Sequence, residues 1–333
     1  MRLCFVVNSV KTQRPTYTTA HLAFSAFRRG HDVAFVPVDA LSQGQGQGGR
    51  GQGQVDDGEV LGEIVRPRPG RVRDTVAYVK GLTAPRAIRE TARLSDFDVV
   101  FLRNNPNAGK WDAGDQDGFN PAIDFGRRLK RAGVMVVNDP DGLTRAGSKM
   151  YLAGFPVELR PKTLVTRSLE RVRAFLRELD GPAIIKPLSG FGGKNVFYLG
   201  RGQTANVAQM ISTVRRDGYV MVQEYLPAVT KGDKRVLLVG GSVCSVGGTV
   251  AAYRRMRPKD DIRSNMHVGG VRKRSEFTEV EARICELLRP RLVADGLYFV
   301  GVDLVGDKIL EINVFAPGGI HNINELYGVD VGT

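Results

Sequence analysis

The sequence predicts an α/β fold that begins with a parallel sheet. Residues 2–8 (RLCFVVN) form an apolar strand, residues 17–29 form a helix that ends at Gly30, and residues 33–38 form a second apolar strand. A strand, a helix and a strand in this order pack as a right-handed crossover on a parallel sheet. The alternation continues with a strand, a helix and a strand at residues 98–103, 119–131 and 134–139.

Beyond residue 139 the expected elements are shorter and more varied. We expect helices at 145–152, 169–179, 205–216 and 280–294, and strands at 162–165, 183–188, 195–199, 220–226, 234–239, 243–253, 297–305 and 308–314. A chain of 333 residues forms two or three domains. We divide it at residues 1–139, 140–219 and 220–333. The Gly/Gln-rich residues 43–54 are expected to be a surface loop, because they cannot form a core.

Composition indicates the cellular compartment of the protein. No apolar run approaches the roughly 20 residues that cross a bilayer, so no membrane attachment is expected. The three cysteines, Cys4, Cys244 and Cys285, are far apart and form no C-x-x-C pair. This pattern favours a reducing cytoplasmic compartment over a disulfide framework or a zinc site.

The formal net charge of +13 favours anionic partners. Residues 254–274 concentrate eight Lys or Arg against Asp260 and Asp261. Nucleic-acid binders interleave such runs with stacking aromatics, and only Tyr253 flanks this one, so nucleic acid is not the expected partner. We interpret residues 254–274 instead as a lid that closes over substrate.

A glycine-rich loop follows the apolar residues 183–185. Residues 186–194 (KPLSGFGGK) carry a lysine at each end, and their glycines let backbone N–H groups approach phosphate oxygens. A plain glycine-rich hairpin turn is the alternative. Neither G-x-x-x-x-G-K-[S/T] nor an early G-x-G-x-x-G is present, which disfavours a P-loop NTPase or a Rossmann dehydrogenase.

The hairpin at residues 301–314 carries polar side chains on apolar strands. Glu311 and Asn313 lie two residues apart and therefore share a face, while Asp303 sits within the apolar run FVGVDLV. Oxygen ligands in such surroundings are costly to bury without a cation, and Mg²⁺ takes one or two carboxylates plus substrate phosphates. A polar strand face in solvent is the alternative, which the apolar neighbours of Asp303 disfavour.

The register of this hairpin decides whether the metal site can form. A two-residue Gly306-Asp307 turn would pair Asp303 with Leu310, so that Asp303 and Glu311 would point apart. A three-residue loop at 306–308 would pair Asp303 with Glu311. We expect the second register, because the metal interpretation requires it.

Residues 220–235 lead from an apolar strand into a polar loop. An extended backbone that leaves a sheet can offer its N–H and C=O groups to an adenine edge. Asp233 could accept hydrogen bonds from ribose hydroxyls, and Arg235 could bind phosphate.

Several ordered motifs resemble the bacterial glutathione synthetases of the ATP-grasp superfamily, and the similarity extends from Met1 to about Tyr327. The motifs are KPLSGFGG at 186–193, QEYLPAVTKGDKR at 223–235, FVGVD at 299–303 and EINV at 311–314, together with Asn138-x-Pro140 and PKTLVT at 161–166. The resemblance implies an ATP-grasp fold with an N-terminal, Rossmann-like pre-ATP-grasp substrate domain. ATP would be held between the sheets of a small lid subdomain and a C-terminal subdomain.

The resemblance also implies roles for individual residues. Residues that would bind ATP are Lys149, Lys186, Gly190, Gly192, Gly193, Gln223, Glu224, Tyr225, Leu226, Asp233 and Arg235. Residues that would hold Mg²⁺, or Mn²⁺ in its place, are Asp303, Glu311 and Asn313. Residues that would stabilise the transferring phosphoryl group are Arg235, Lys186 and Arg263.

The implied reaction joins γ-glutamylcysteine to glycine through an acyl-phosphate and releases ADP and phosphate. The resemblance further implies small-molecule substrates and, by analogy with the family, a homo-oligomer. Residues 315–319 (FAPGG) replace a hydroxyl-rich run of the family, so a ligase with another carboxylate donor or amine acceptor is the first alternative. A non-catalytic, basic nucleic-acid-binding protein is the second, although it would have no use for Asp303, Glu311 and Asn313.

Overall fold

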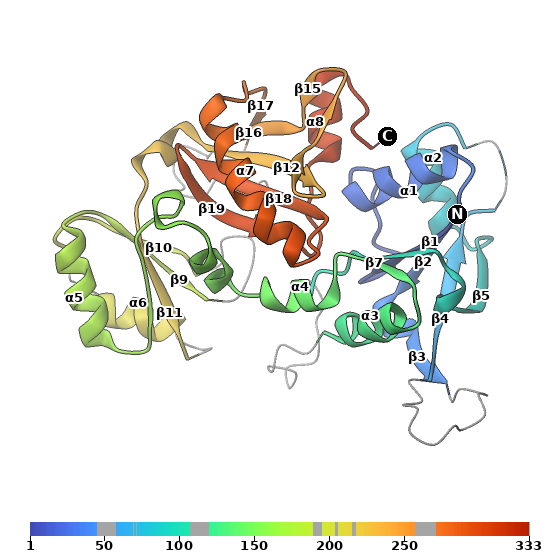
Figure 1. The fold of residues 1–333 in the computed structure, drawn as a ribbon, viewed down its shortest axis with the longest axis horizontal. Coiled ribbons are helices and arrows are strands. Elements are labelled where there is room, and N and C mark those ends of the chain that lie inside the picture. Colours follow the sequence, from blue (N-terminus) through green and yellow to red (C-terminus); the bar gives the residue numbers. More distant parts are fainter. Residues whose placement is uncertain are drawn as a thin grey trace.

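The computed structural model describes residues 1–44, 58–68, 70, 72–106, 120–188, 195–203, 206–214, 218–256 and 271–332. Three sheets of four or more strands organise these residues. Figure 1 shows the N-terminal sheet at one end of the molecule, a small sheet at the other end, and the C-terminal sheet between them.

The N-terminal sheet has the parallel core that the sequence predicts. Strand β1 (Arg2–Val7) lies between β2 (Asp32–Pro37) and β6 (Val99–Leu102), and all run parallel. Helix α1 (Thr18–Arg28) connects the first two strands, and β7 (Met135–Val137) extends the sheet beyond β6. Phe5, which is buried, stacks between Phe35 and Phe101 from the neighbouring strands. The predicted β-α-β unit is therefore confirmed.

The far edge of this sheet is antiparallel, which the sequence did not indicate. Strand β4 (Glu59–Arg66) pairs antiparallel with β2, β3 (Leu41–Gly44) and β5 (Ile88–Arg93). Helices α2 (Thr75–Thr83) and α3 (Pro121–Arg131) complete this part of the chain. Most of the Gly/Gln-rich stretch, residues 45–54, lies outside the described residues.

The connection to the next sheet differs from the expected helix at 145–152. A short helix α4 (Pro140–Arg145) begins earlier, because Asp139 caps the amides of Asp141 and Gly142 and Pro140 occupies the first turn. A separate 3₁₀ helix, η3 (Lys149–Gly154), follows, with Ser148 accepting from the Met150 amide.

The small sheet is antiparallel and is covered by two helices. Its strand order is β10-β9-β11-β8, with β8 (Thr163–Thr166), β9 (Ala183–Pro187), β10 (Phe197–Leu199) and β11 (Val220–Glu224). Helices α5 (Leu169–Leu179) and α6 (Val207–Val214) contribute to its apolar core. Because β11 is hydrogen-bonded within this sheet, the change to the next sheet falls after Glu224, later than the expected boundary at 219/220.

The C-terminal sheet has the order β17-β16-β12-β18-β19. Its strands are β12 (Asp233–Val239), β16 (Ala252–Met256), β17 (Val271–Lys273), β18 (Phe299–Val305) and β19 (Lys308–Asn313), and β13 (Ser242–Val243) pairs with β12. Helix α7 (Glu279–Ala294) begins at a capping box between Thr278 and Glu281, and α8 (Ile320–Tyr327) ends the fold.

The single strand expected at 243–253 is wrong. Gly247 and Gly248 both adopt positive φ and turn the chain into a separate hairpin of β14 (Ser245–Val246) and β15 (Thr249–Val250). The remaining strand, β16, starts only at Ala252.

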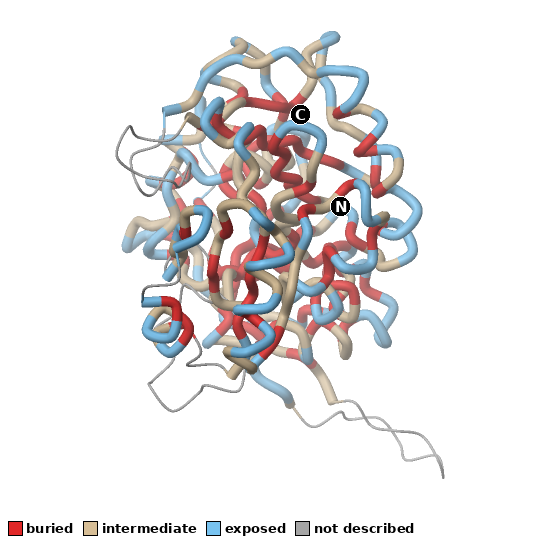
Figure 2. Tube along the Cα trace, turned by 90° about the vertical axis from the view of Figure 1, so that its left-hand side faces the viewer, coloured by how far each residue is buried: buried red, intermediate tan, exposed pale blue. Residues whose placement is uncertain are grey.

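Figure 2 shows the buried residues gathered inside the molecule, and many of them belong to strands of the three sheets. Among the buried polar side chains, Arg103 and Asn138 follow β6 and β7, and Asp303 lies within β18. No helix in the described part of the chain is long and apolar enough to cross a membrane.

Candidate active site

The hairpin of β18 and β19 pairs Asp303 with Glu311, as the metal interpretation requires. The turn is the two-residue Gly306-Asp307, since Val305 pairs with Lys308. The expected three-residue loop is therefore wrong. A β-bulge achieves the register instead: Leu304 pairs with Ile309, and the next pair is Asp303 with Glu311, which leaves Leu310 as the extra residue.

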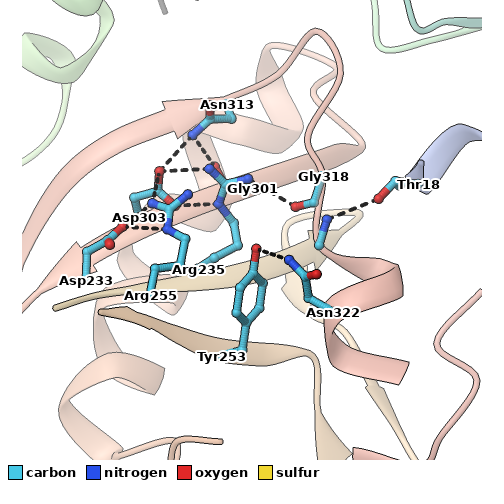
Figure 3. Close-up of polar contacts among 11 residues, drawn as sticks. Thr18, Asp233, Arg235, Tyr253, Arg255, Gly301, Asp303, Asn313, Gly318 and Asn322 are labelled. Carbon is cyan, nitrogen blue, oxygen red and sulfur yellow. Dashed lines mark hydrogen bonds and ion pairs between the residues drawn. The ribbon is translucent and has the colours of Figure 1, made fainter. Parts of the chain in front are cut away.

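Asp303 is buried and is held by two arginines (Figure 3). Arg235, opposite it on β12, donates from Nε to Oδ1 and from Nη2 to Oδ2, the latter at 2.9 Å. Arg255 on β16 places Nη2 2.8 Å from Oδ2. Burial raises the pKa of Asp303, but the two guanidinium groups outweigh it and hold this pKa below its usual range.

Asp233 on β12 lies at the other end of this network. Its Oδ2 accepts from Arg255 Nε at 3.0 Å and from Arg255 Nη2, and the residue has no exposed surface. Its Oδ1 has no hydrogen-bond partner among the described residues. The ribose contact expected of Asp233 stays a prediction, and it depends on this Oδ1 atom.

Glu311 and Asn313 lie beside Asp303, and their side chains differ in hydrogen bonding. Asn313 Nδ2 donates to Asp303 Oδ2 at 3.2 Å. The side chain of Glu311 has no hydrogen bond and no ion pair to any described residue. Burial and then the charge of Asp303 raise the pKa of Glu311, against the influence of Lys149 and Lys186. A carboxylate that no protein group hydrogen-bonds is a suitable ligand for a cation.

Two lysines reach this hairpin from the small-sheet side of the site. Lys186 on β9 is only 9% exposed and donates to Gln223 Oε1 at 2.9 Å. Burial lowers its pKa to about 8, with Glu311 opposing and Lys149 adding to the shift. Lys149 begins η3 and donates to the Leu188 carbonyl at 3.4 Å. Lys149, Leu188 and Glu311 line one pocket.

The segment Gln223 to Leu226 leaves the small sheet at the end of β11. The amides of Glu224 and Tyr225 already donate to the carbonyls of Lys162 and Pro182. The Leu226 amide has no hydrogen bond to any described residue. The adenine contact therefore stays a prediction. The groups that could make it are the Leu226 N–H and the backbone carbonyls of the segment.

Some expected site residues lie outside the described residues. These are Gly190, Gly192, Gly193, Arg263 and, from the basic segment, residues 257–270. The described ends of that segment, β16 and β17, pair antiparallel.

Arg103 was missed from the sequence. It follows β6 and is 7% exposed, with Nε 3.1 Å from Thr19 Oγ1 and Nη2 3.0 Å from the Pro317 carbonyl. The adjacent Gly318 carbonyl accepts from Arg235 Nη1 at 3.0 Å. A basic residue directly after an apolar strand of a parallel sheet is a usable signal, since ligands bind at the carboxyl ends of such strands.

Asn138 was expected only as part of a motif, and it joins the domains. Its Nδ2 donates to the carbonyls of Phe299 and Val314, and its Oδ1 accepts from the Phe299 amide at 2.7 Å. These residues flank the two strands that carry Asp303 and Glu311. Asn138 therefore fixes the hairpin against the N-terminal sheet.

The chain is similar in sequence to known proteins. Residues 1–144 match the family model of the prokaryotic glutathione synthetase N-terminal domain, and residues 148–328 match that of its ATP-grasp domain. The glutathione synthetase of Gloeobacter violaceus is 34% identical over 336 residues, 99% of this chain and 93% of that protein. That of Synechococcus elongatus is 33% identical over 342 residues, 100% of this chain and 96% of that protein.

Solved structures share the fold at low identity. D-cycloserine synthetase DcsG aligns with a TM-score of 0.62 at 16% identity, over 100% of this chain and 97% of that one. The ATP-grasp ligase PsnB, complexed with a phosphomimetic precursor variant, Mg and ADP, aligns with a TM-score of 0.61 at 19% identity, over 99% and 94% of the two chains. The chain therefore belongs to the prokaryotic glutathione synthetase family and is an ATP-dependent ligase with the ATP-grasp fold.

Proposed function

We propose that this chain joins γ-glutamylcysteine to glycine, with ATP converted to ADP and phosphate. The carboxylate of the cysteinyl residue attacks the γ-phosphorus of ATP, and ADP leaves. The glycine amine then attacks the resulting acyl-phosphate, loses a proton and displaces phosphate. Both steps need positioning and charge neutralisation more than proton transfer, which agrees with a site without histidine or cysteine among its described polar groups.

Lys149 and Lys186 are the residues that we assign to the phosphates of ATP. They converge on Glu311 from η3 and β9, and burial lowers the pKa of each although the charge of Glu311 opposes this shift. Gly190, Gly192 and Gly193 would contribute backbone N–H groups. The segment Gln223 to Leu226 would contact adenine and Asp233 Oδ1 the ribose.

Asp303, Glu311 and Asn313 are the residues that would hold Mg²⁺ or Mn²⁺. The described residues contain no cluster of three His, Cys, Asp or Glu, which disfavours a site built from protein ligands alone. Two carboxylates and an amide suit Mg²⁺, which completes its coordination with phosphate oxygens and water. The bound ion would neutralise phosphate charge. Arg235 and Arg263 would add positive charge at the transferring group.

One observation carries the proposal. The side chain of Glu311 has no hydrogen bond or ion pair to a described residue, and Glu311 lies opposite Asp303 in the hairpin. The charges of Lys149 and Lys186 act on its carboxylate. This arrangement suits a metal–triphosphate. The test is product formation from ATP, Mg²⁺, γ-glutamylcysteine and glycine, with ADP counted and the product identified by mass.

A different substrate pair is the second candidate. The loop of residues 315–319 (FAPGG) contacts Arg103 and Arg235 through two backbone carbonyls, and its side chains offer no hydroxyl to an acceptor. A panel of carboxylate donors and amine acceptors separates the two candidates. Turnover of another pair, with none of γ-glutamylcysteine and glycine, would replace the proposed substrates while leaving the ligase chemistry intact.

We also propose a cytoplasmic setting, a homo-oligomer and a three-part division whose second boundary follows Glu224. Three unpaired cysteines support the reducing compartment. Sedimentation of the purified chain tests the oligomer. Family membership as a ligase removes the non-catalytic nucleic-acid-binding alternative.

A further inference from the structure

The segment that carries Lys149 is fastened to the C-terminal end of α7 by one carboxylate. Asp295, the residue that follows α7, accepts from the Tyr151 hydroxyl at 2.7 Å and from Arg145 Nε at 2.7 Å. Its side chain is only 13% exposed. Arg145 ends α4 and Tyr151 lies in η3. The two contacts therefore hold the chain on both sides of Lys149.

The ring of Tyr151 is held by the last turn of α7 as well. The guanidinium carbon of Arg291 lies 5.1 Å from the centre of the Tyr151 ring, and Phe155 meets that ring edge-on at 5.4 Å. Arg291 also forms an ion pair with Asp295, with Nε 3.6 Å from Oδ2. Burial, and then the hydrogen bond to Asp295, raise the pKa of the Tyr151 hydroxyl, which therefore stays protonated and donates.

The backbones of α4 and of the turn after α7 touch at the same place. A Cβ atom at Gly142 would lie 1.9 Å from the Asp295 carbonyl oxygen, so this approach requires a glycine. The Asp139 amide donates to the Gly296 carbonyl at 3.0 Å. The same turn leads into β18. These contacts therefore tie the connection of α4 and η3 to the strand that carries Asp303.

Lys149 lies where such support matters. A 3₁₀ helix is short and has poorer hydrogen-bond geometry than an α-helix, so η3 is not expected to hold its side chains rigidly by itself. Lys149 and Tyr151 nevertheless line one pocket, together with Leu188 and Glu311. A misplacement of about 1 Å at a group that binds a reacting phosphate can cost about 100-fold in rate. Groups that fix such a side chain contribute to the site without touching the ligand.

We propose that Tyr151 and Asp295 are positioning residues of the ligase, which hold Lys149 at the triphosphate of ATP. This inference rests on the proposed function, which assigns Lys149 to the phosphates. The Tyr151 hydroxyl has one hydrogen and donates it to Asp295, so the pair acts on ATP through Lys149. Arg145 supports Asp295 from the other side of the segment.

The test is a double-mutant cycle on nucleotide affinity. Tyr151→Phe removes one hydroxyl, Asp295→Ala removes the acceptor of both contacts, and each is made in the wild type and in Lys149→Met. The matched control is Thr278→Ala, which removes the hydroxyl that caps the opposite end of α7. Calorimetric titration with the Mg²⁺ complex of AMPPNP gives Kd for every protein, and thermal melting shows whether each is folded.

Lys149→Met should raise Kd about 10- to 100-fold, the range of a charge-assisted hydrogen bond. Tyr151→Phe should raise Kd about 3- to 10-fold, and Asp295→Ala at least as much. In the Lys149→Met background, neither should change Kd by more than about twofold. Thr278→Ala should lower the melting temperature and leave Kd unchanged. If Asp295→Ala does not melt cooperatively, Tyr151→Phe in the two backgrounds carries the test.

Two results would overturn the inference. One is an unchanged Kd in folded Tyr151→Phe, and the other is an equal loss with and without Lys149→Met, which would show that Tyr151 acts independently of Lys149. Failure of the proposed phosphate role is distinguishable, because Lys149→Met itself would then leave Kd unchanged, and the inference would fall with it. The donor and acceptor do not enter the measurement, so a different substrate pair leaves its outcome intact.

Discussion

Arg235 and Arg103 bind consecutive carbonyls of one loop, yet their electrostatic surroundings are opposite. Arg235 is matched by Asp303, so that its pKa is raised although burial alone would lower it. Arg103 has only neutral partners among the described residues, and burial lowers its pKa to about 9. The first arginine belongs to a buried ion-pair network, and the second is held by neutral groups alone among the described residues.

The same contrast separates Asp303 from Glu311. Both lie on one hairpin and pair with each other, but Asp303 has two arginines and an asparagine, whereas Glu311 has no bonded partner in the described structure. Substitution of Asp303 is therefore expected to reduce both stability and metal binding, whereas substitution of Glu311 is expected to reduce metal binding alone.

The largest expected effect on stability is that of Asp303→Asn. It leaves Arg235 and Arg255 buried without their shared counter-charge, and removal of one partner of a buried ion pair costs about 3–5 kcal/mol. Urea unfolding measures this. The control Asp180→Asn breaks the exposed pair with Arg201 and should cost at most about 1 kcal/mol. Equal losses in the two variants would contradict the comparison.

Glu311→Gln should abolish turnover without reducing stability at neutral pH. The pKa of Glu311 in the fold is raised above its ordinary value of 4.5, so the folded state binds more protons than the unfolded state above that pH. The wild type should therefore lose stability through this group as pH rises from 4.5, and Glu311→Gln should not. Unfolding free energies between pH 4 and 7 test this, and a less stable Glu311→Gln at pH 7 would count against it.

The pH dependence of ATP use should follow Lys186. Its pKa of about 8 means that the charged form, which binds phosphate, is lost as pH rises through about 8. The value of kcat/KM for ATP reports the free enzyme and should fall above that pH. Lys186→Arg should keep activity to higher pH, while Lys186→Met should lose turnover. A flat profile in the wild type up to pH 10 would exclude Lys186 from this role.

The smallest expected effect on stability is that of Arg103→Met. The variant loses two hydrogen bonds to neutral groups but also removes a buried charge without an acidic partner in the described structure, so the two changes oppose each other. Its urea midpoint should stay far closer to the wild type than that of Asp303→Asn. A loss as large as that of Asp303→Asn would indicate a structural counter-charge for Arg103.

The sequence predicted one geometric feature of the site correctly, because polar residues interrupt apolar strands there. Asp303 lies opposite Glu311 and Asn313 donates to Asp303, while the role of the three residues as metal ligands stays a prediction. The bulge at Leu310 could not be predicted, because the sequence does not show which residue of a strand is left without a partner on the neighbouring strand. The sequence places Lys186 beside a glycine-rich loop but does not indicate its burial. That burial against Gln223 depends on the pairing of β9 with β11.

Contacts between distant segments account for what the sequence did not reveal. Asp233 was assigned to ribose alone, because its pairing with Arg255 depends on the register of β12 and β16. Arg103 was overlooked because its neighbours, Thr19 and Pro317, are 84 and 214 residues away. The antiparallel edge of β3, β4 and β5 follows segments with little regular alternation, which gave no strand signal.

Oxygen transfer tests the central claim most directly. We predict that a donor labelled with ¹⁸O in its reacting carboxylate transfers one labelled oxygen to phosphate, because that oxygen bonds to the γ-phosphorus and leaves with it when the amine attacks. Mass spectrometry of the phosphate, with ADP and γ-glutamylcysteinylglycine in equal amounts, would show this. ADP and the peptide formed with unlabelled phosphate would contradict an acyl-phosphate intermediate.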